Sequence, residues 1–236
     1  MSEPNDPSSG QSGQLSRRAL FGRVSAAGAF VALPAFLSAA DAAQLRRPQR
    51  EPLETLTPAE ADVLEAIAAR LIPSDATSAG AADARAAHYI DRALGGTLSS
   101  FRDAYRAGLA SVDVFARASR GGPFAQLPAA DQDALLVEME RNTATGFSGG
   151  AATFFNLVLA HTLQGTFGDP YYGGNKDFAG WDLIGYPGVR LAVTEAEQRL
   201  DASPRPTHMS AYDYSMFAGR KPARADLAVK HDAHGD

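Results

Sequence analysis

Few residues of this chain have a type and spacing that could do chemistry. Its five histidines are scattered, and His161 lies in an apolar stretch, where a buried imidazole needs hydrogen-bond partners. We therefore expect a core or interface histidine at this position, with a metal or proton-transfer role as the alternative. Three carboxylates, Asp169, Asp177 and Asp182, accompany Gly- and Tyr-rich turns, where Asp side chains usually accept hydrogen bonds from nearby backbone amides.

A saccharide-binding face is a second kind of chemistry that the residues allow. Trp181, Tyr171 and Tyr172 lie near these carboxylates in the sequence, and aromatic rings can stack on a sugar. No strand–Gly-x-Gly-x-x-Gly–helix unit, P-loop, nucleophile elbow or His-Glu-x-x-His motif accompanies them. An independent periplasmic enzyme or carbohydrate-binding module using His161, Asp169 and Trp181 is therefore kept as the alternative hypothesis.

The composition excludes several classes of chemistry and of binding partner. The 236 residues include no cysteine, which excludes disulfides, Cys-ligated metal centres, covalently attached c-type haem and a Cys nucleophile. A net charge of −5 argues against a nucleic-acid surface, since such surfaces cluster basic side chains. With 45% of its residues apolar, the chain can bury the core of one ordinary domain that carries appendages.

Residues 1–43 have the features of an export signal. A polar, basic leader precedes the weakly apolar run 24–40, which has a small-residue end. Paired arginines beside large apolar residues favour a twin-arginine (Tat) signal read by the Tat translocase. The motif comprises Ser16, Arg17, Arg18, Leu20 and Phe21. We expect export to the periplasm, with an uncleaved signal or membrane anchor as the alternative.

Residues 57–200 are predicted to form a mainly α, small helical domain of about five helices. After a Pro-containing linker (44–56), Thr57-Pro58-Ala59-Glu60 forms a capping box that opens the first helix, which ends before Pro73. Apolar residues spaced by three and four predict further helices at 83–94, 98–119, 128–141 and 151–167. The last of these is apolar almost all round, so it should be central in the core or covered by a partner.

From Gly168 onward the chain is predicted to be a long irregular segment. Glycine, tyrosine and tryptophan recur among turn-forming residues as far as Gly188, and a helix-sized stretch follows at 191–200. The C-terminal tail (201–236) carries methionine and aromatic residues at no helical spacing. Such a segment is typical of a partner-binding arm, with a disordered tail as the alternative.

Four sequence blocks resemble the gluconate 2-dehydrogenase subunit 3 family, the small subunit of membrane-associated FAD-dependent sugar and sugar-acid dehydrogenases. They are the Ser16-Arg17-Arg18 leader, Leu56–Glu60 leading to Ala69–Asp75, Ala160–Gly165, and Phe167–Asn175 with Gly180–Gly188. The last block is the most specific, because its Gly-Asp-Pro and Gly-Trp signatures rarely occur together by chance. One departure is Ala79, where the family more often has proline.

The resemblance implies a periplasmic complex in which this chain holds no cofactor and no catalytic residue. A large GMC-type subunit would bind FAD, and a multihaem cytochrome c subunit would pass electrons to the membrane. The small subunit would assist maturation and Tat export of the flavoprotein. The candidate contacts to that partner are His161, Asp169, Pro170, Tyr171, Tyr172, Asn175, Trp181 and Tyr186, with a purely structural turn as the alternative for the block after Gly168.

Overall fold

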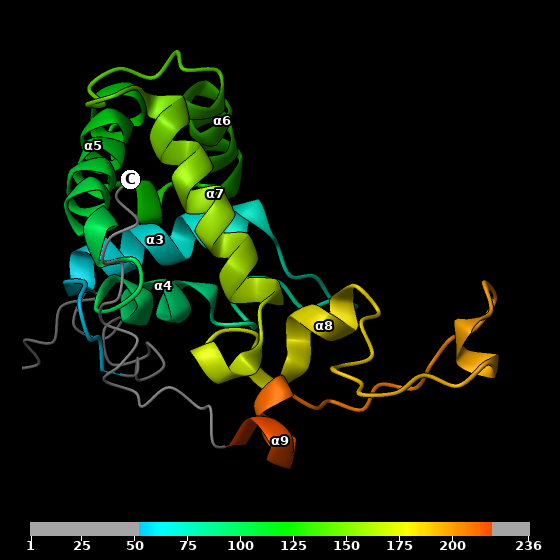
Figure 1. The fold of residues 1–236 in the computed structure, drawn as a ribbon. Helices are drawn as coiled ribbons and strands as arrows, with labels where there is room; N and C mark the ends of the chain where they lie inside the picture. The colour runs from blue at the N-terminus through cyan, green and yellow to red at the C-terminus, as the bar shows by residue number, and fades with distance from the viewer. Residues whose placement is uncertain (1–51, 219–236) are drawn as a thin grey trace, which may run out of the picture. The chain divides into compact units, whose positions relative to one another are not determined.

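The computed structural model describes residues 52–218, which form seven α-helices and no strand (Figure 1). The helices are α3 (Pro58–Leu71), α4 (Ala86–Leu94), α5 (Arg102–Arg120), α6 (Ala129–Glu140), α7 (Ala151–Phe167), α8 (Ala179–Leu183) and α9 (Ser215–Ala218). The predicted mainly α class is confirmed, with five longer helices close to their predicted places and two short ones added. The predicted Tat motif from Ser16 to Phe21 and residues 219–236 lie outside the described residues.

Helix α3 begins at the predicted capping box. The Thr57 hydroxyl oxygen accepts a hydrogen bond from the Glu60 amide at 3.3 Å, and the Glu60 carboxylate accepts one from the Thr57 amide at 2.8 Å. Pro58 occupies the first helical position, where a missing amide costs nothing. The apolar face of the helix, including Leu64 and Ile67, is buried. Local sequence is therefore sufficient to start this helix, and core packing holds it.

Helix α7 is central in the core, as its apolar sequence predicted. It contacts α3, α4, α5, α6 and α8 (Figure 1). Phe154, Phe155 and Val158 of α7 belong to the main buried cluster, together with Tyr105 and Leu109 of α5. Each such buried side chain contributes about 1.5–3 kcal/mol relative to its exposed state. In a chain without disulfides, this burial is the principal source of stability.

Helix α4 begins at Ala86, later than the predicted start at Asp83. Arg85 adopts a left-handed backbone with a φ of 59°, and the Ala86 amide donates to the Ala81 carbonyl oxygen at 2.9 Å. The Asp83 carboxylate accepts a hydrogen bond from the Gly80 amide at 2.9 Å. These local bonds satisfy the backbone between Gly80 and Arg85 without a helix, which is why the helical pattern overestimated the element.

The helix-sized stretch at 191–200 does not form an α-helix and contains only a single 3-10 turn, Ala196–Gln198. Thr194 donates its amide and its hydroxyl to the Glu197 carboxylate at 2.9 and 2.8 Å, so a helix-like start does form. The large apolar side chains of the stretch remain exposed, however. A short helix without a buried face is not stable in water, and the turn therefore does not propagate.

Residues 54–56, just before α3, are held by a buried carboxylate that no sequence pattern indicated. Asp91 of α4 is fully buried and accepts hydrogen bonds from the amides of Glu54, Thr55 and Leu56, at 2.7, 3.0 and 2.7 Å. Arg92 pairs with the Glu54 carboxylate at 3.4 Å. A buried carboxylate requires such donors, and the linker amides in turn require an acceptor. Asp91 thereby fixes residues 54–56 against α4.

Candidate functional site

The stretch that follows α7 forms a junction between α7 and α8, and Asn175 lies at its centre. The side chain of Asn175 is fully buried; its Nδ2 donates to the Gly168 carbonyl oxygen at 2.9 Å. Its Oδ1 accepts hydrogen bonds from the Gly180 and Trp181 amides at 2.8 and 3.3 Å. The Asn175 amide donates to the Gly165 carbonyl oxygen at 2.7 Å. One residue therefore joins the end of α7 to the beginning of α8.

Two glycines allow this junction to close. A Cβ atom at Gly174 would lie 2.1 Å from the Gly165 carbonyl oxygen, and a Cβ atom at Gly180 would lie 1.8 Å from the Thr166 carbonyl oxygen. Both atoms that would be met belong to the backbone of α7, so no side-chain rotation can relieve the overlap. The two segments approach backbone to backbone, which requires residues without a Cβ atom.

Trp181 of α8 is a buried part of this junction. Its side chain is only 4% exposed, and its indole Nε1 donates to the Phe167 carbonyl oxygen at 2.9 Å. Phe178 and Tyr186 pack against the indole with ring centroids 5.4 and 4.8 Å away. A sugar needs an open aromatic face on which to stack, and the indole offers none. The structure therefore does not favour a carbohydrate-binding role for Trp181.

Asp169 connects the junction to the C-terminal tail. Its carboxylate accepts a hydrogen bond from the Tyr171 amide at 2.9 Å, the turn-forming role expected of an Asp in this context. It also accepts hydrogen bonds from the Ser210 hydroxyl at 2.7 Å and from the Ala211 amide at 3.0 Å. The turn could be predicted from local sequence, whereas the contact with the tail joins residues that are 41 positions apart.

Three tyrosines strengthen the same contact. The hydroxyl groups of Tyr172 and Tyr212 share a hydrogen bond of 2.8 Å, and the Tyr171 ring lies 4.1 Å from the Tyr212 ring. The hydrogen bond with Tyr212, together with partial burial, raises the pKa of Tyr172 to about 12. This part of the tail therefore packs on the turn that follows α7.

His161 is buried on α7, apart from these contacts. It is 5% exposed, and its Nδ1 shares a hydrogen bond of 2.9 Å with the hydroxyl group of Tyr105 on α5. The Tyr105 ring stacks on the imidazole at 5.8 Å, and the Phe101 ring meets it edge-on at 5.4 Å. Burial lowers the pKa of the imidazole below its ordinary value of 6.5. These contacts agree with the expected core histidine.

We expect the His161 imidazole to titrate below pH 6.5 and the protein to lose stability on acidification. The unfolded chain binds this proton more readily than the folded chain, so the free energy of unfolding should fall as the pH drops below 6.5. NMR titration of the imidazole measures the midpoint. Tyr105→Phe is the control, since it keeps the burial and should leave the midpoint below 6.5. A wild-type midpoint at or above 6.5 contradicts the prediction.

A further polar pair was not indicated by any sequence pattern. His208 Nε2 lies 2.7 Å from Asp182 Oδ1, and the imidazole stacks on the Phe178 ring at 4.8 Å. The pair joins the tail to α8 at the surface. Its members are 26 positions apart, one in the short helix α8 and the other in the tail, so only the fold brings them together.

The residues predicted to contact a partner differ in exposure. His161, Asn175 and Trp181 are buried; Asp169, Pro170, Tyr171 and Tyr172 are half-buried; Tyr186 is exposed. All of them except His161 belong to the junction and the turn beside it. The buried members act within the chain, and a partner contact by the half-buried and exposed members stays a prediction.

Exposed apolar side chains are concentrated at the end of this junction and just beyond it. Of the eleven large hydrophobic residues that are exposed among residues 52–218, six lie between 183 and 200. They are Leu183, Ile184, Tyr186, Leu191, Val193 and Leu200. An ordered segment this rich in exposed apolar side chains is a candidate for a protein–protein contact. No sequence pattern singled it out, because exposure depends on what the rest of the chain covers.

The fold and the junction define a small, mainly α-helical domain whose central polar residues are used in internal contacts. The chain belongs to the gluconate 2-dehydrogenase subunit 3 family, whose model matches residues 58–188, more than half of the sequence. This finding confirms the resemblance that the four sequence blocks predicted. No curated protein and no solved structure matches the chain.

Neither a metal-binding cluster nor a membrane-spanning helix is found among residues 52–218. No group of three or more His, Asp or Glu side chains in this part of the chain is placed to hold a metal ion. Each helix within the same residues is too short or too polar to cross a lipid bilayer.

Proposed function

We propose that this chain is the non-catalytic small subunit of a periplasmic, FAD-dependent (GMC-type) gluconate or sugar dehydrogenase complex. Its family is one of dehydrogenase subunits, which supports an accessory role beside other chains. The observation that carries the proposal is the group of six exposed apolar residues between 183 and 200. Exposure of apolar side chains to water is unfavourable. A complex in which a partner protein covers them is therefore stabilised by their burial.

The polar residues of the junction also support an accessory role. Asp169, Asn175 and Trp181 each donate or accept hydrogen bonds within the chain. A general acid or base must reach a substrate proton directly or through one water molecule. Side chains already committed to holding α7, α8 and the tail together are better suited to maintaining a shape than to chemistry.

In this proposal the redox cofactors are held by the other subunits. The large subunit binds FAD and oxidises the sugar, and a multihaem cytochrome c subunit carries haem c and links the complex to the membrane. The sequence contains no cysteine, so this chain has no thiol through which haem c could be attached. Its own contribution is to stabilise the flavoprotein during maturation and to supply the export signal.

The export role predicts a strong effect of the twin arginines. Changing Arg17 and Arg18 to lysine keeps the charge but removes the feature that the Tat translocase reads, so we expect both this chain and the flavoprotein to stay in the cytoplasm. Cell fractionation with immunoblotting of both subunits measures this. The matched control changes Arg46 and Arg47, a second arginine pair after the signal, to lysine and should leave export unchanged. Normal export of the Arg17/Arg18 variant would rule out the Tat assignment.

The subunit role has its own test. The expected partner is a large chain with an N-terminal Gly-x-Gly-x-x-Gly motif and no export signal, encoded beside this one. Co-expression with a tag on the small subunit should yield a stable complex with FAD absorbance. A stable monomer that never associates with this flavoprotein contradicts the proposal, as does sugar oxidation by the purified small subunit alone.

A further inference from the structure

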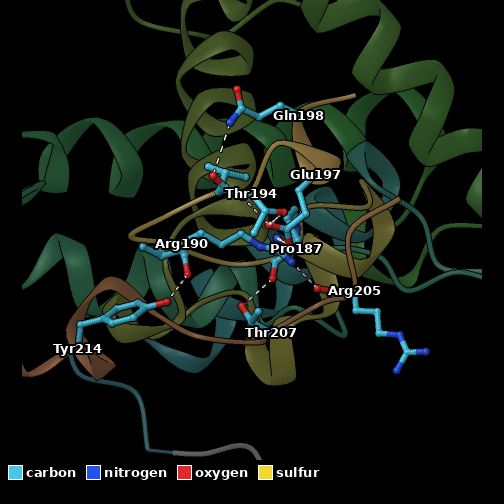
Figure 2. A network of polar contacts seen from close by, with 10 residues as sticks. Pro187, Arg190, Thr194, Glu197, Gln198, Arg205, Thr207 and Tyr214 are labelled. Atoms are coloured by element: carbon cyan, nitrogen blue, oxygen red, sulfur yellow. Dashed lines mark hydrogen bonds and ion pairs between the residues drawn. The ribbon is translucent and has the colours of Figure 1, made fainter. Parts of the chain in front are cut away.

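Residues 187–209 form a long loop whose two ends are joined by hydrogen bonds. The Thr207 amide and hydroxyl donate to the Pro187 carbonyl oxygen at 2.7 and 2.8 Å (Figure 2). The Val189 amide donates to the Met209 carbonyl oxygen at 2.9 Å. The Tyr214 hydroxyl donates to the Val189 carbonyl oxygen at 2.7 Å. Loops of this length with little secondary structure are usually functional when they are ordered.

A polar network holds the interior of the 187–209 loop. The Arg190 guanidinium pairs with the Glu197 carboxylate and also donates to the Arg205 carbonyl oxygen at 2.8 Å (Figure 2). The Thr194 amide and hydroxyl, followed by Arg190, lower the pKa of Glu197 to about 2. Glu197 therefore stays ionised at any physiological pH. Its carboxylate links residue 197 to Arg190 and Thr194 within the loop.

Three large apolar side chains are exposed on the loop, among charges that balance one another. Leu191, Val193 and Leu200 are 53%, 52% and 108% exposed. The stretch 190–205 has three basic and three acidic side chains, and two oppositely charged pairs form within it, Arg190 with Glu197 and Arg199 with Asp201. The charges of the loop already neutralise one another. A partner surface that buries this loop therefore needs little net charge.

The 187–209 loop also begins where the family match ends, at residue 188. The matched part contains the helical core and the junction, whereas the loop lies beyond it. An ordered loop outside the shared domain is suited to a task that differs from one family member to another. Selection of the correct large subunit is such a task.

We infer that the 187–209 loop is the docking element through which this chain binds its flavoprotein subunit. Leu191, Val193 and Leu200 enter an uncharged, apolar groove of that subunit. A strongly acidic or basic groove would be buried against this neutral loop without compensating charges, which is unfavourable. The network around Glu197 fixes the loop before binding, so less conformational entropy is lost on association. The inference rests on the proposed subunit role.

The test compares the affinities of full-length variants for the purified, FAD-loaded large subunit. Changing Leu191, Val193 and Leu200 together to serine should weaken binding about 1,000-fold, because a buried anchor commonly contributes about tenfold. The control changes Val114 and Val137, exposed valines of α5 and α6, to serine and should bind as the wild type does. Leu200→Ser alone, at a fully exposed position, should weaken binding about tenfold without affecting folding.

A second variant tests the contribution of loop order. Glu197→Gln keeps all three apolar side chains but weakens the bonds to Arg190 and Thr194. We expect faster hydrogen exchange of amides in 190–205 and about tenfold weaker binding. Faster exchange with unchanged affinity would show that the ordered conformation is not required, and would overturn that part of the inference.

The outcomes separate the docking element from the subunit role. If the wild-type chain does not bind the flavoprotein, the proposed function fails. If the wild type binds and the triple serine variant binds equally well, the loop is not the docking element, while the proposed function stands. If the triple variant abolishes self-association of this chain but not flavoprotein binding, the loop serves a second copy and the inference is overturned.

Discussion

Gly180→Ala is expected to lower the free energy of unfolding by about 3 kcal/mol or more. The added Cβ atom would lie 1.8 Å from the Thr166 carbonyl oxygen, which belongs to the backbone of α7. Helix α8 must then move away from α7. This movement breaks the 2.8 Å hydrogen bond from the Gly180 amide to Asn175 and uncovers the indole of Trp181. The cost is large because a clash and the loss of buried contacts occur together.

The chain provides a direct probe for this variant. Trp181 is its only tryptophan and lies within the affected junction, so its fluorescence reports on the site during urea denaturation. The matched control is Gly122→Ala, where the Cβ atom would meet only the Leu127 side chain at an ordinary 3.4 Å. The control should change the free energy of unfolding by no more than about 1 kcal/mol. Equal stability of the two variants would contradict the close approach of α8 to α7.

Asp91→Ala is the second variant for which we expect a large effect, a loss of about 3 kcal/mol or more. The substitution leaves the amides of Glu54, Thr55 and Leu56 without their acceptor, and the Leu56 amide is in a buried environment. It also creates a cavity beside α4, since Asp91 is fully buried. The linker before α3 should then detach from α4.

A graded series tests the mechanism. Asp91→Asn retains one acceptor oxygen, which serves Thr55 and Leu56, but replaces the oxygen that accepts from Glu54. We expect stability to decrease from the wild type to Asp91→Asn to Asp91→Ala, and limited proteolysis of the linker to accelerate in the same order. Asp103→Ala, whose side chain is 95% exposed, is the control and should have little effect. Unchanged proteolysis in Asp91→Ala would contradict the anchoring role.

The helical elements could be predicted because their signals are local. Thr57 and Glu60 are three residues apart, and their reciprocal bonds form as soon as the first turn forms. Helix α7 has the predicted bounds, since its continuous apolar sequence can be satisfied only in the interior. The family resemblance was also available from short blocks, and the match over residues 58–188 confirms it.

The junction shows where this local information ends. The sequence indicated that Asp169, Asn175 and Trp181 were unusual, but their roles as internal contacts depend on the position of α8 and the tail. Asn175 is polar and Trp181 amphipathic, so either could equally have served an exposed contact. Their burial is decided by the backbone approach that Gly174 and Gly180 permit.

The sequence alone determined the mainly α class, the family and the absence of thiol chemistry, because periodicity, short motifs and composition need no knowledge of three-dimensional neighbours. Only the tertiary structure decided that the stretch 191–200 belongs to a loop held by polar contacts and not to a helix. The physical reason is that a short helix survives only when a face is buried, and burial is set by segments distant in sequence. For the same reason, only the fold could show that Leu191, Val193 and Leu200 are exposed in an ordered loop.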